Sequence, residues 1–86
     1  MDINNLIAIV KKKLNNEIVI EKIEVEDKSF LHKNHSGHEE GKFHLKLIIS
    51  SDELRKLNKI KSNKKIYKVL DEEMKEYIHS LQILIS

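Results

Sequence analysis

The residues that most often interrupt helices and strands are confined to one short part of this chain of 86 residues. There is no proline, and both glycines, Gly37 and Gly41, lie within residues 29–44. Glycine and proline are the strongest breakers of regular secondary structure. We therefore expect residues 29–44 to form a long polar loop, and the rest of the chain to consist of uninterrupted helices and strands.

The spacing of the apolar residues predicts the order of these elements. Apolar residues three and four positions apart predict helices, and alternating apolar residues predict strands. The expected elements are, in order, a helix over residues 3–14, strands over 18–27 and 43–50, helices over 52–58 and 63–77, and a strand over 78–85. Asp2 and Ser51 should cap the first two helices, and Tyr67 should lie on the buried face of the third. A slip in alternation between Ile20 and Ile23 indicates a bulge in the first strand, or a strand that begins late.

This order describes an α+β fold of the form αββααβ. The first two strands should pair antiparallel across the loop, and the third, which follows a helical crossover, should lie parallel to its neighbour. The result is a three-stranded mixed sheet. All helices should cover the same face, because three strands cannot bury both faces of a sheet.

Composition restricts the classes of function. The length suits a single domain over residues 1–86, and the absence of cysteine excludes disulfides, thiolate catalysis and a self-sufficient iron–sulfur site. No apolar run approaches the ~20 residues of a membrane span and no export signal is apparent, so we expect a cytoplasmic protein that does not bind membranes. An enzyme is the least expected class, because no nucleophile is paired with a base, and Asp71, Glu72 and Glu73 are typical of a solvated helix turn.

Four of the five histidines lie within residues 29–44, namely His32, His35, His38 and His44. Neutral imidazole is the commonest metal ligand among side chains, and histidines three residues apart can converge on one ion. We predict that one loop histidine and His79, which opens the last strand, form half of a metal site whose other half comes from another molecule. The alternatives are a solvated loop, or a free-standing zinc or copper carrier that uses His32, His35 and His38.

Two of the histidines have competing interpretations. His44 begins a strand on the side opposite its apolar face, so we expect it to be structural. His79 shares its phase of alternation with Leu81 and Ile83. It should therefore point toward the core, unless it lies just beyond the sheet.

A run of lysines crosses the start of the third predicted helix: Lys59, Lys61, Lys64 and Lys65. Cations are unfavourable at that end of the helix dipole. The presence of four lysines there indicates a partner with an anionic surface, either a nucleic-acid backbone or a protein that carries glutathione. The alternative is a solvated charged face. The net charge of +2 alone is too small to indicate nucleic acid.

Three segments resemble characteristic blocks of the BolA-like family: IEVEDKSF at residues 23–30, HLKLIIS at 44–50 and LDEEMKEYIHSLQI at 70–83. The resemblance implies a BolA-like αββααβ fold, topologically similar to a type II KH domain. It also implies a partner of monothiol glutaredoxins that is monomeric alone and forms a heterodimer in which a bridged [2Fe–2S] cluster is shared with the glutaredoxin and glutathione. The family acts in iron–sulfur cluster trafficking and iron homeostasis. Some bacterial members are described as transcriptional regulators, so a KH-like nucleic-acid-binding regulator is the alternative function.

The cluster ligands of the family map onto this chain by position. The histidine that opens the last strand corresponds to His79, and the loop histidine nine residues before His44 corresponds to His35. Because the loop length varies in the family, His32 and His38 are alternates. No cofactor is expected on the isolated chain. Residues 62–64, Ser-Asn-Lys, replace an Arg-His-Arg sequence of the family, which speaks against a dedicated DNA-binding role.

Overall fold

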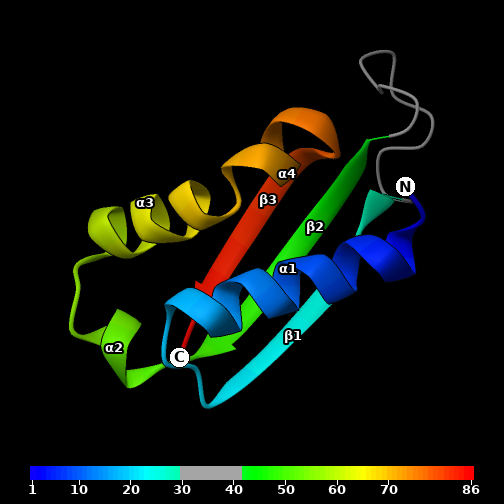
Figure 1. Cartoon of the computed structure of the whole chain (residues 1–86). Coiled ribbons are helices and arrows are strands. Elements are labelled where there is room, and N and C mark those ends of the chain that lie inside the picture. Colours follow the sequence, from blue (N-terminus) through cyan, green and yellow to red (C-terminus); the bar gives the residue numbers. More distant parts are fainter. Residues whose placement is uncertain (30–41) are drawn as a thin grey trace.

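A three-stranded sheet and four helices make up the described part of the chain, residues 1–29 and 42–86, in a computed structural model (Figure 1). In chain order the elements are α1 (Ile3–Glu17), β1 (Lys22–Asp27), β2 (Phe43–Ser50), α2 (Asp52–Arg55), α3 (Lys59–Val69), α4 (Asp71–Glu76) and β3 (Ile78–Ile85). The predicted α+β fold class is confirmed.

The last predicted helix differs from expectation at its start and in its middle. It begins at Lys59 rather than at residue 63, because the Asn58 side chain accepts a hydrogen bond from the Lys61 amide at 2.8 Å and caps the helix there. It is also divided into α3 and α4 at Leu70, whose backbone dihedrals of −97° and 18° leave the helical region. The result is a basic helix that begins about one turn earlier than the sequence indicated.

The sheet has the predicted topology. β1 pairs antiparallel with β2, and β2 pairs parallel with β3, so β2 is the central strand. β1 begins late rather than carrying a bulge. Before it, the Ile18 amide donates to the Leu14 carbonyl at 2.9 Å, which closes the end of α1, and the Ile18 side chain is buried.

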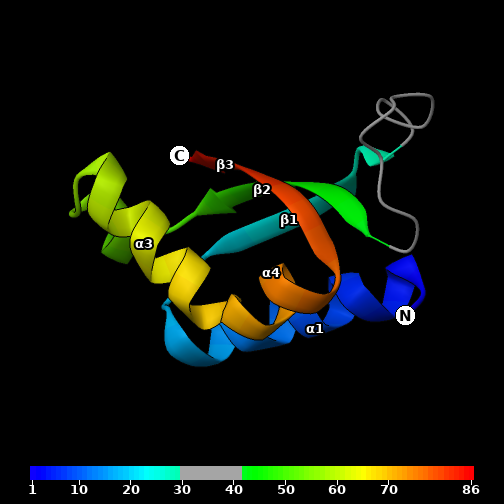
Figure 2. The same ribbon diagram turned by 90° about the horizontal axis from the view of Figure 1, so that it is seen from above.

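Helices α1, α3 and α4 lie on the same face of the sheet, as predicted and as Figure 2 shows. The core between the two layers is aliphatic and includes Leu6, Val10, Leu14, Leu45, Leu47, Ile49, Ile66 and Leu70. Burial of each such side chain contributes about 1.5–3 kcal/mol. Within residues 1–29 and 42–86, no helix has the length and apolar character needed to cross a membrane.

Both predicted helix caps are present. Oδ1 of Asp2 accepts a hydrogen bond from the Asn5 amide at 2.9 Å, and Oγ of Ser51 accepts one from the Leu54 amide at 3.2 Å. The buried Ser51 hydroxyl also donates to the Val19 carbonyl at 2.7 Å. This residue therefore joins the start of α2 to the segment before β1.

The prediction that Tyr67 lies in the core is wrong. Ser62 and Ile66 are the buried residues of α3, and this leaves Tyr67 on its flank, 39% exposed. The Tyr67 hydroxyl donates to the Leu81 carbonyl at 3.1 Å and so fastens α3 to β3.

Candidate metal site at the start of the last strand

The pairing of β2 with β3 shifts by one residue where β3 begins. Phe43 lies opposite Ile78, but His44 lies opposite Ser80, so His79 has no opposite residue, as in a β-bulge. The bulge reverses the alternation of side chains. Ile78 and Leu81 are both buried although they are three residues apart, and His79 between them is exposed. The inward direction that simple alternation gives for His79 is therefore wrong.

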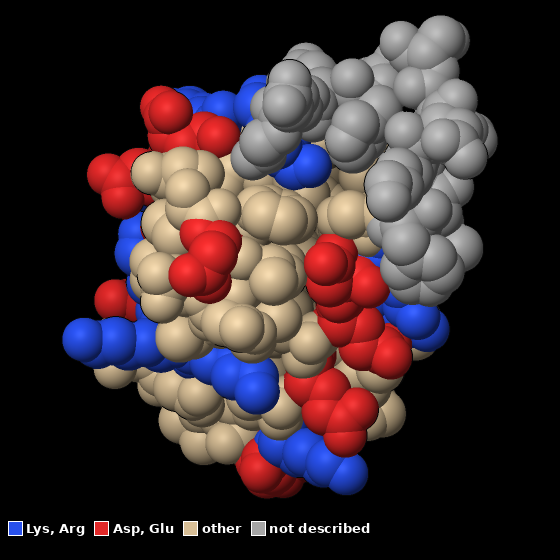
Figure 3. All heavy atoms as spheres, turned by 90° about the vertical axis from the view of Figure 1, so that its right-hand side faces the viewer, with Lys and Arg blue, Asp and Glu red and all other residues tan. Residues whose placement is uncertain are grey.

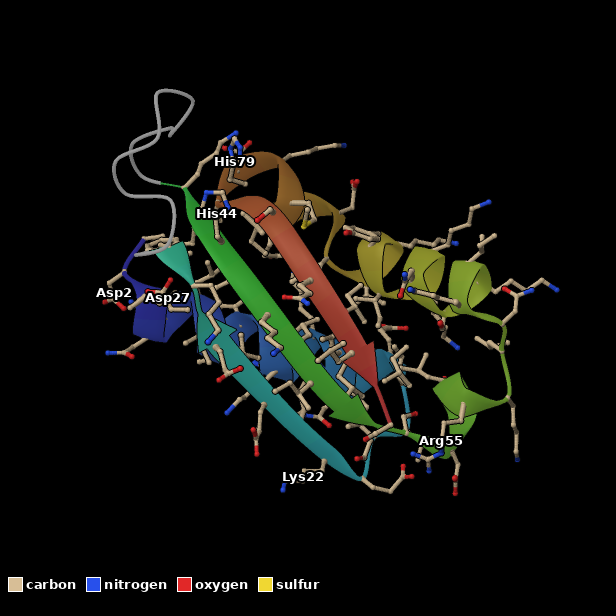
Figure 4. The ribbon with its side chains drawn as sticks, turned by 180° about the vertical axis from the view of Figure 1, so that it is seen from behind. Asp2, Lys22, Asp27, His44, Arg55 and His79 are labelled. Carbon is tan, nitrogen blue, oxygen red and sulfur yellow. The ribbon has the colours of Figure 1, made fainter. Side chains whose placement is uncertain are left out.

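The exposed His79 ring lies against the ring of His44. The two ring centroids are 4.8 Å apart, and the ring planes are tilted by 52°. Figure 4 shows both side chains at one end of the sheet, with Lys22 and Arg55 at the other end. Residues 35 positions apart in the sequence thus present two imidazoles side by side.

His44 is held in place from several sides. Its side chain is on the face of β2 opposite the core, yet the residue is only 6% exposed. Its ring Nδ1 lies 2.6 Å from Ser80 Oγ, and its backbone amide donates to Ser29 Oγ at 3.0 Å. A hydrogen bond at one ring nitrogen sets the tautomer and orientation of an imidazole. For Nε2 of His44 to bind a metal, Nδ1 must carry the proton and donate it to Ser80.

The described residues do not form a complete metal site by themselves. Within residues 1–29 and 42–86, no group of three or more His, Cys, Asp or Glu side chains is placed to hold a metal ion. The predicted loop ligand His35, and its alternates His32 and His38, lie outside the described residues. Both described ends of that segment are close to the imidazole pair, since Ser29 bonds to His44 and Lys42 precedes Phe43, whose amide donates to the Tyr77 carbonyl at 2.9 Å.

The burial of His44 and its hydrogen bond to Ser80 agree with the expected structural role, but the sequence did not predict its position beside His79. The adjacency of His44 and His79 depends on the parallel register of β2 and β3, which no local pattern reveals. The pair could have been predicted from one sequence feature: a histidine lies near the start of each of two strands that were predicted to be parallel neighbours. We therefore include His44 in the candidate site as a residue that packs against His79.

Most of the predicted lysine cluster borders a hollow in the helical layer. This hollow, about 860 Å³ in volume, lies between the last turns of α1 and the length of α3. It is lined by Lys13, Asn16, Glu17, Lys61, Lys64, Lys65, Lys68 and Val69, and we call it the α1–α3 recess. Lys13 and Lys68 were not predicted. Lys13 is far from α3 in sequence and only the fold brings it there, whereas Lys68 lies in the predicted helix but beyond the run of lysines at its start. Lys59 instead lines a smaller hollow of about 400 Å³ beside the end of β3.

Two lysines of the recess are engaged in ion pairs. Lys65 bonds to Glu53 at 2.8 Å, and this hydrogen bond lowers the pKa of the Glu53 carboxyl. Lys13 bonds to Glu73 at 2.6 Å, which raises the pKa of the lysine, and it reaches Glu72 at 3.2 Å. The expectation that Glu73 is a solvated helix residue is wrong, since it is 4% exposed and links α4 to α1.

The lysines of α3 contrast with the net charge of the rest of the chain. The face seen in Figure 3 carries both acidic and basic side chains on a largely uncharged surface. The α3 helix carries five lysines and no acidic residue. Because the chain as a whole has a charge of +2, the remainder is net negative.

The fold and its surface features define a class of small α+β domain, with a three-stranded mixed sheet, imidazoles at one end of that sheet and lysines on its helical layer. The family model described as "BolA-like protein" matches residues 14–86. The chain belongs to the BolA-like family.

Known relatives and a solved structure agree with this assignment. The chain is 29% identical over 75 residues to "DNA-binding transcriptional regulator BolA" of Haemophilus influenzae, covering 87% of this chain and 70% of that protein. It is 32% identical over 80 residues to "SufE-like protein 1, chloroplastic/mitochondrial" of Arabidopsis thaliana, covering 87% of this chain but only 22% of that much longer protein. The solved BolA domain of SufE1 from Arabidopsis thaliana superposes with a TM-score of 0.81 at 29% identity, covering 99% of this chain and 94% of the domain.

Proposed function

We propose that this protein is a non-enzymatic partner of a monothiol glutaredoxin that co-ligates a bridged [2Fe–2S] cluster through histidine and acts in iron–sulfur cluster trafficking and iron homeostasis. The observation that carries the proposal is the exposed His79 ring packed beside His44 at the start of β3. Imidazole is an accepted iron ligand of such clusters, in place of thiolate on one iron. A chain without cysteine can supply only this imidazole half, so the partner and glutathione must supply the thiolates.

The proposed ligands are His79 and one histidine of the 30–41 segment, with His35 first and His32 and His38 as alternates. Chain length permits each of them. An extended chain covers at most ~3.3–3.6 Å per residue, and His35 is six residues from Ser29, which bonds to His44. His44 is proposed as a positioning residue whose ring packs against His79, and its replacement separates this role from ligation.

The experiment is reconstitution of the complex from this protein, a monothiol glutaredoxin, iron, sulfide and glutathione, followed by visible circular dichroism. We expect His79→Ala to abolish the spectrum of the mixed complex, and one of the single alanine variants at the three loop histidines to do the same. A spectrum unchanged by His79→Ala would remove that residue from the site. His44→Phe keeps a ring but has no nitrogen, so retention of the spectrum identifies a positioning residue and its loss identifies a ligand.

A second candidate function is regulation of transcription through nucleic acid. It is favoured by the printed name of the Haemophilus relative and by the lysines of α3. Against it, residues 56–58 between α2 and α3 are Lys-Leu-Asn, so the glycine-rich clamp of KH domains is absent from this turn. Affinity for duplex DNA that falls steeply with salt would support this function. Stoichiometric zinc binding by the isolated protein, measured by titration calorimetry, would instead favour a metal carrier.

A further inference from the structure

We propose that the α1–α3 recess is a docking site for an acidic helix of a partner protein. Three of its lysines, Lys61, Lys64 and Lys68, form no ion pair with any residue in the described part of the chain. Like charges three and four residues apart on a helix repel each other. A row of them bordering a hollow, rather than a convex surface, indicates an anionic occupant that offsets the repulsion.

The shape of the recess favours a helix as that occupant. Its walls are two helices, and the three unpaired lysines lie on successive turns of α3. A helix with one carboxylate per turn lying beside α3 can therefore meet each of them.

The chemistry of the lining favours protein over nucleic acid. Val69 and the aliphatic stems of the lysines supply apolar contact for one side of a helix, as in other helix-in-groove complexes. Among the described residues that line it, there is no aromatic ring on which a base could stack and no arginine to bind a phosphate through two hydrogen bonds. Glu17, at the end of α1, is the acidic residue among them and should oppose an acidic ligand.

This site is separate from the imidazole pair. The recess lies against the last turns of α1. These turns and the start of β2 lie at opposite ends of the molecule (Figure 1). An acidic partner could therefore dock while His79 is engaged. The inference does not rest on the proposed cluster function.

The test uses the full protein and a fluorescently labelled, alanine-rich helical peptide with one glutamate per turn. Its controls are the same peptide with glutamine in place of glutamate, and short single-stranded and duplex DNA with the same label. Fluorescence anisotropy should show salt-sensitive binding of the acidic peptide only. The double variant Lys64→Gln/Lys68→Gln should weaken binding about tenfold, since each exposed pair is worth a few-fold in affinity.

Matched variants separate a specific site from general electrostatics and from misfolding. The double variant Lys22→Gln/Lys46→Gln removes the same charge from the sheet and should leave affinity nearly unchanged. Glu17→Gln should tighten binding, which a damaged fold cannot do. Equal weakening by both double variants, or equal binding of the glutamine peptide, would overturn the proposal. If the protein binds DNA more tightly than the peptide, and the Lys64→Gln/Lys68→Gln variant loses that binding, the recess is a nucleic-acid site rather than a docking site for a helix. The His79→Ala variant should bind the peptide normally. A failure of the docking proposal can therefore be distinguished from a failure of the proposed cluster function.

Discussion

Replacement of His44 tests the packing of the candidate metal site. His44→Ala removes the hydrogen bond between Nδ1 and Ser80 Oγ at 2.6 Å, which contributes about 0.5–1.5 kcal/mol. It also removes the ring contact with His79 at 4.8 Å, worth about 0.5–1.5 kcal/mol by analogy with other ring pairs. The expected loss in the free energy of unfolding is about 1–3 kcal/mol. In a domain of this size each kcal/mol lowers the melting temperature by about 4–8 °C.

The assay is thermal unfolding followed by far-ultraviolet circular dichroism, supported by urea titration at room temperature. His44→Phe keeps a ring beside His79 and loses the hydrogen bond to Ser80, so we expect it to be destabilised by about 0.5–1.5 kcal/mol. Gln82→Ala, an exposed change on the same strand, is the control and should stay within about 0.5 kcal/mol of the native protein. The reasoning is refuted if His44→Ala is as stable as the native protein, or if the Phe and Ala variants are equally destabilised.

Three further predictions concern the framework that holds the two surfaces. The hydrogen bond from Lys65 lowers the folded-state pKa of Glu53, so its stabilising effect is complete above the ordinary glutamate pKa and is lost as the pH falls through the lowered value. Glu53→Gln should therefore be less stable at neutral pH and lose less stability in acid, as urea titration at several pH values would show. Leu47→Ala, at a core position with 0% exposure, should lower the free energy of unfolding by about 2–5 kcal/mol. A loss of less than 1 kcal/mol would contradict the described core. Ser51→Ala should lower the free energy of unfolding by at least about 0.5–2 kcal/mol in the same urea titration, because it removes the cap of α2 and leaves the Val19 carbonyl without its donor.

Most of the fold follows from local patterns in the sequence. The confinement of Gly37 and Gly41 to one segment, together with the absence of proline, leaves long uninterrupted elements whose type can be read from apolar spacing. The parallel placement of β3 follows from the helical crossover before it. The start of α3 could not be read in the same way, because its first turn has little apolar periodicity and depends on the Asn58 cap.

The candidate sites depend on tertiary detail that such patterns do not contain. A one-residue bulge turns His79 outward, and the register of two strands brings His44 beside it. Neither feature leaves a periodic mark in the sequence. Likewise, the recess joins Lys13 of α1 to lysines of α3 that lie about half the chain away, so its composition becomes visible only after the helices have packed.

The most direct measurement of the central claim is pulsed electron paramagnetic resonance on the reduced cluster of the reconstituted complex. Only this protein would carry histidine labelled with the heavy nitrogen isotope, with glutaredoxin and glutathione unlabelled. We predict nitrogen couplings that change with the label, and we expect no label-dependent coupling in the mixture made with His79→Ala. Nitrogen couplings that do not change with the isotope label, or that are the same with the native protein and with His79→Ala, would contradict ligation of the cluster by this chain.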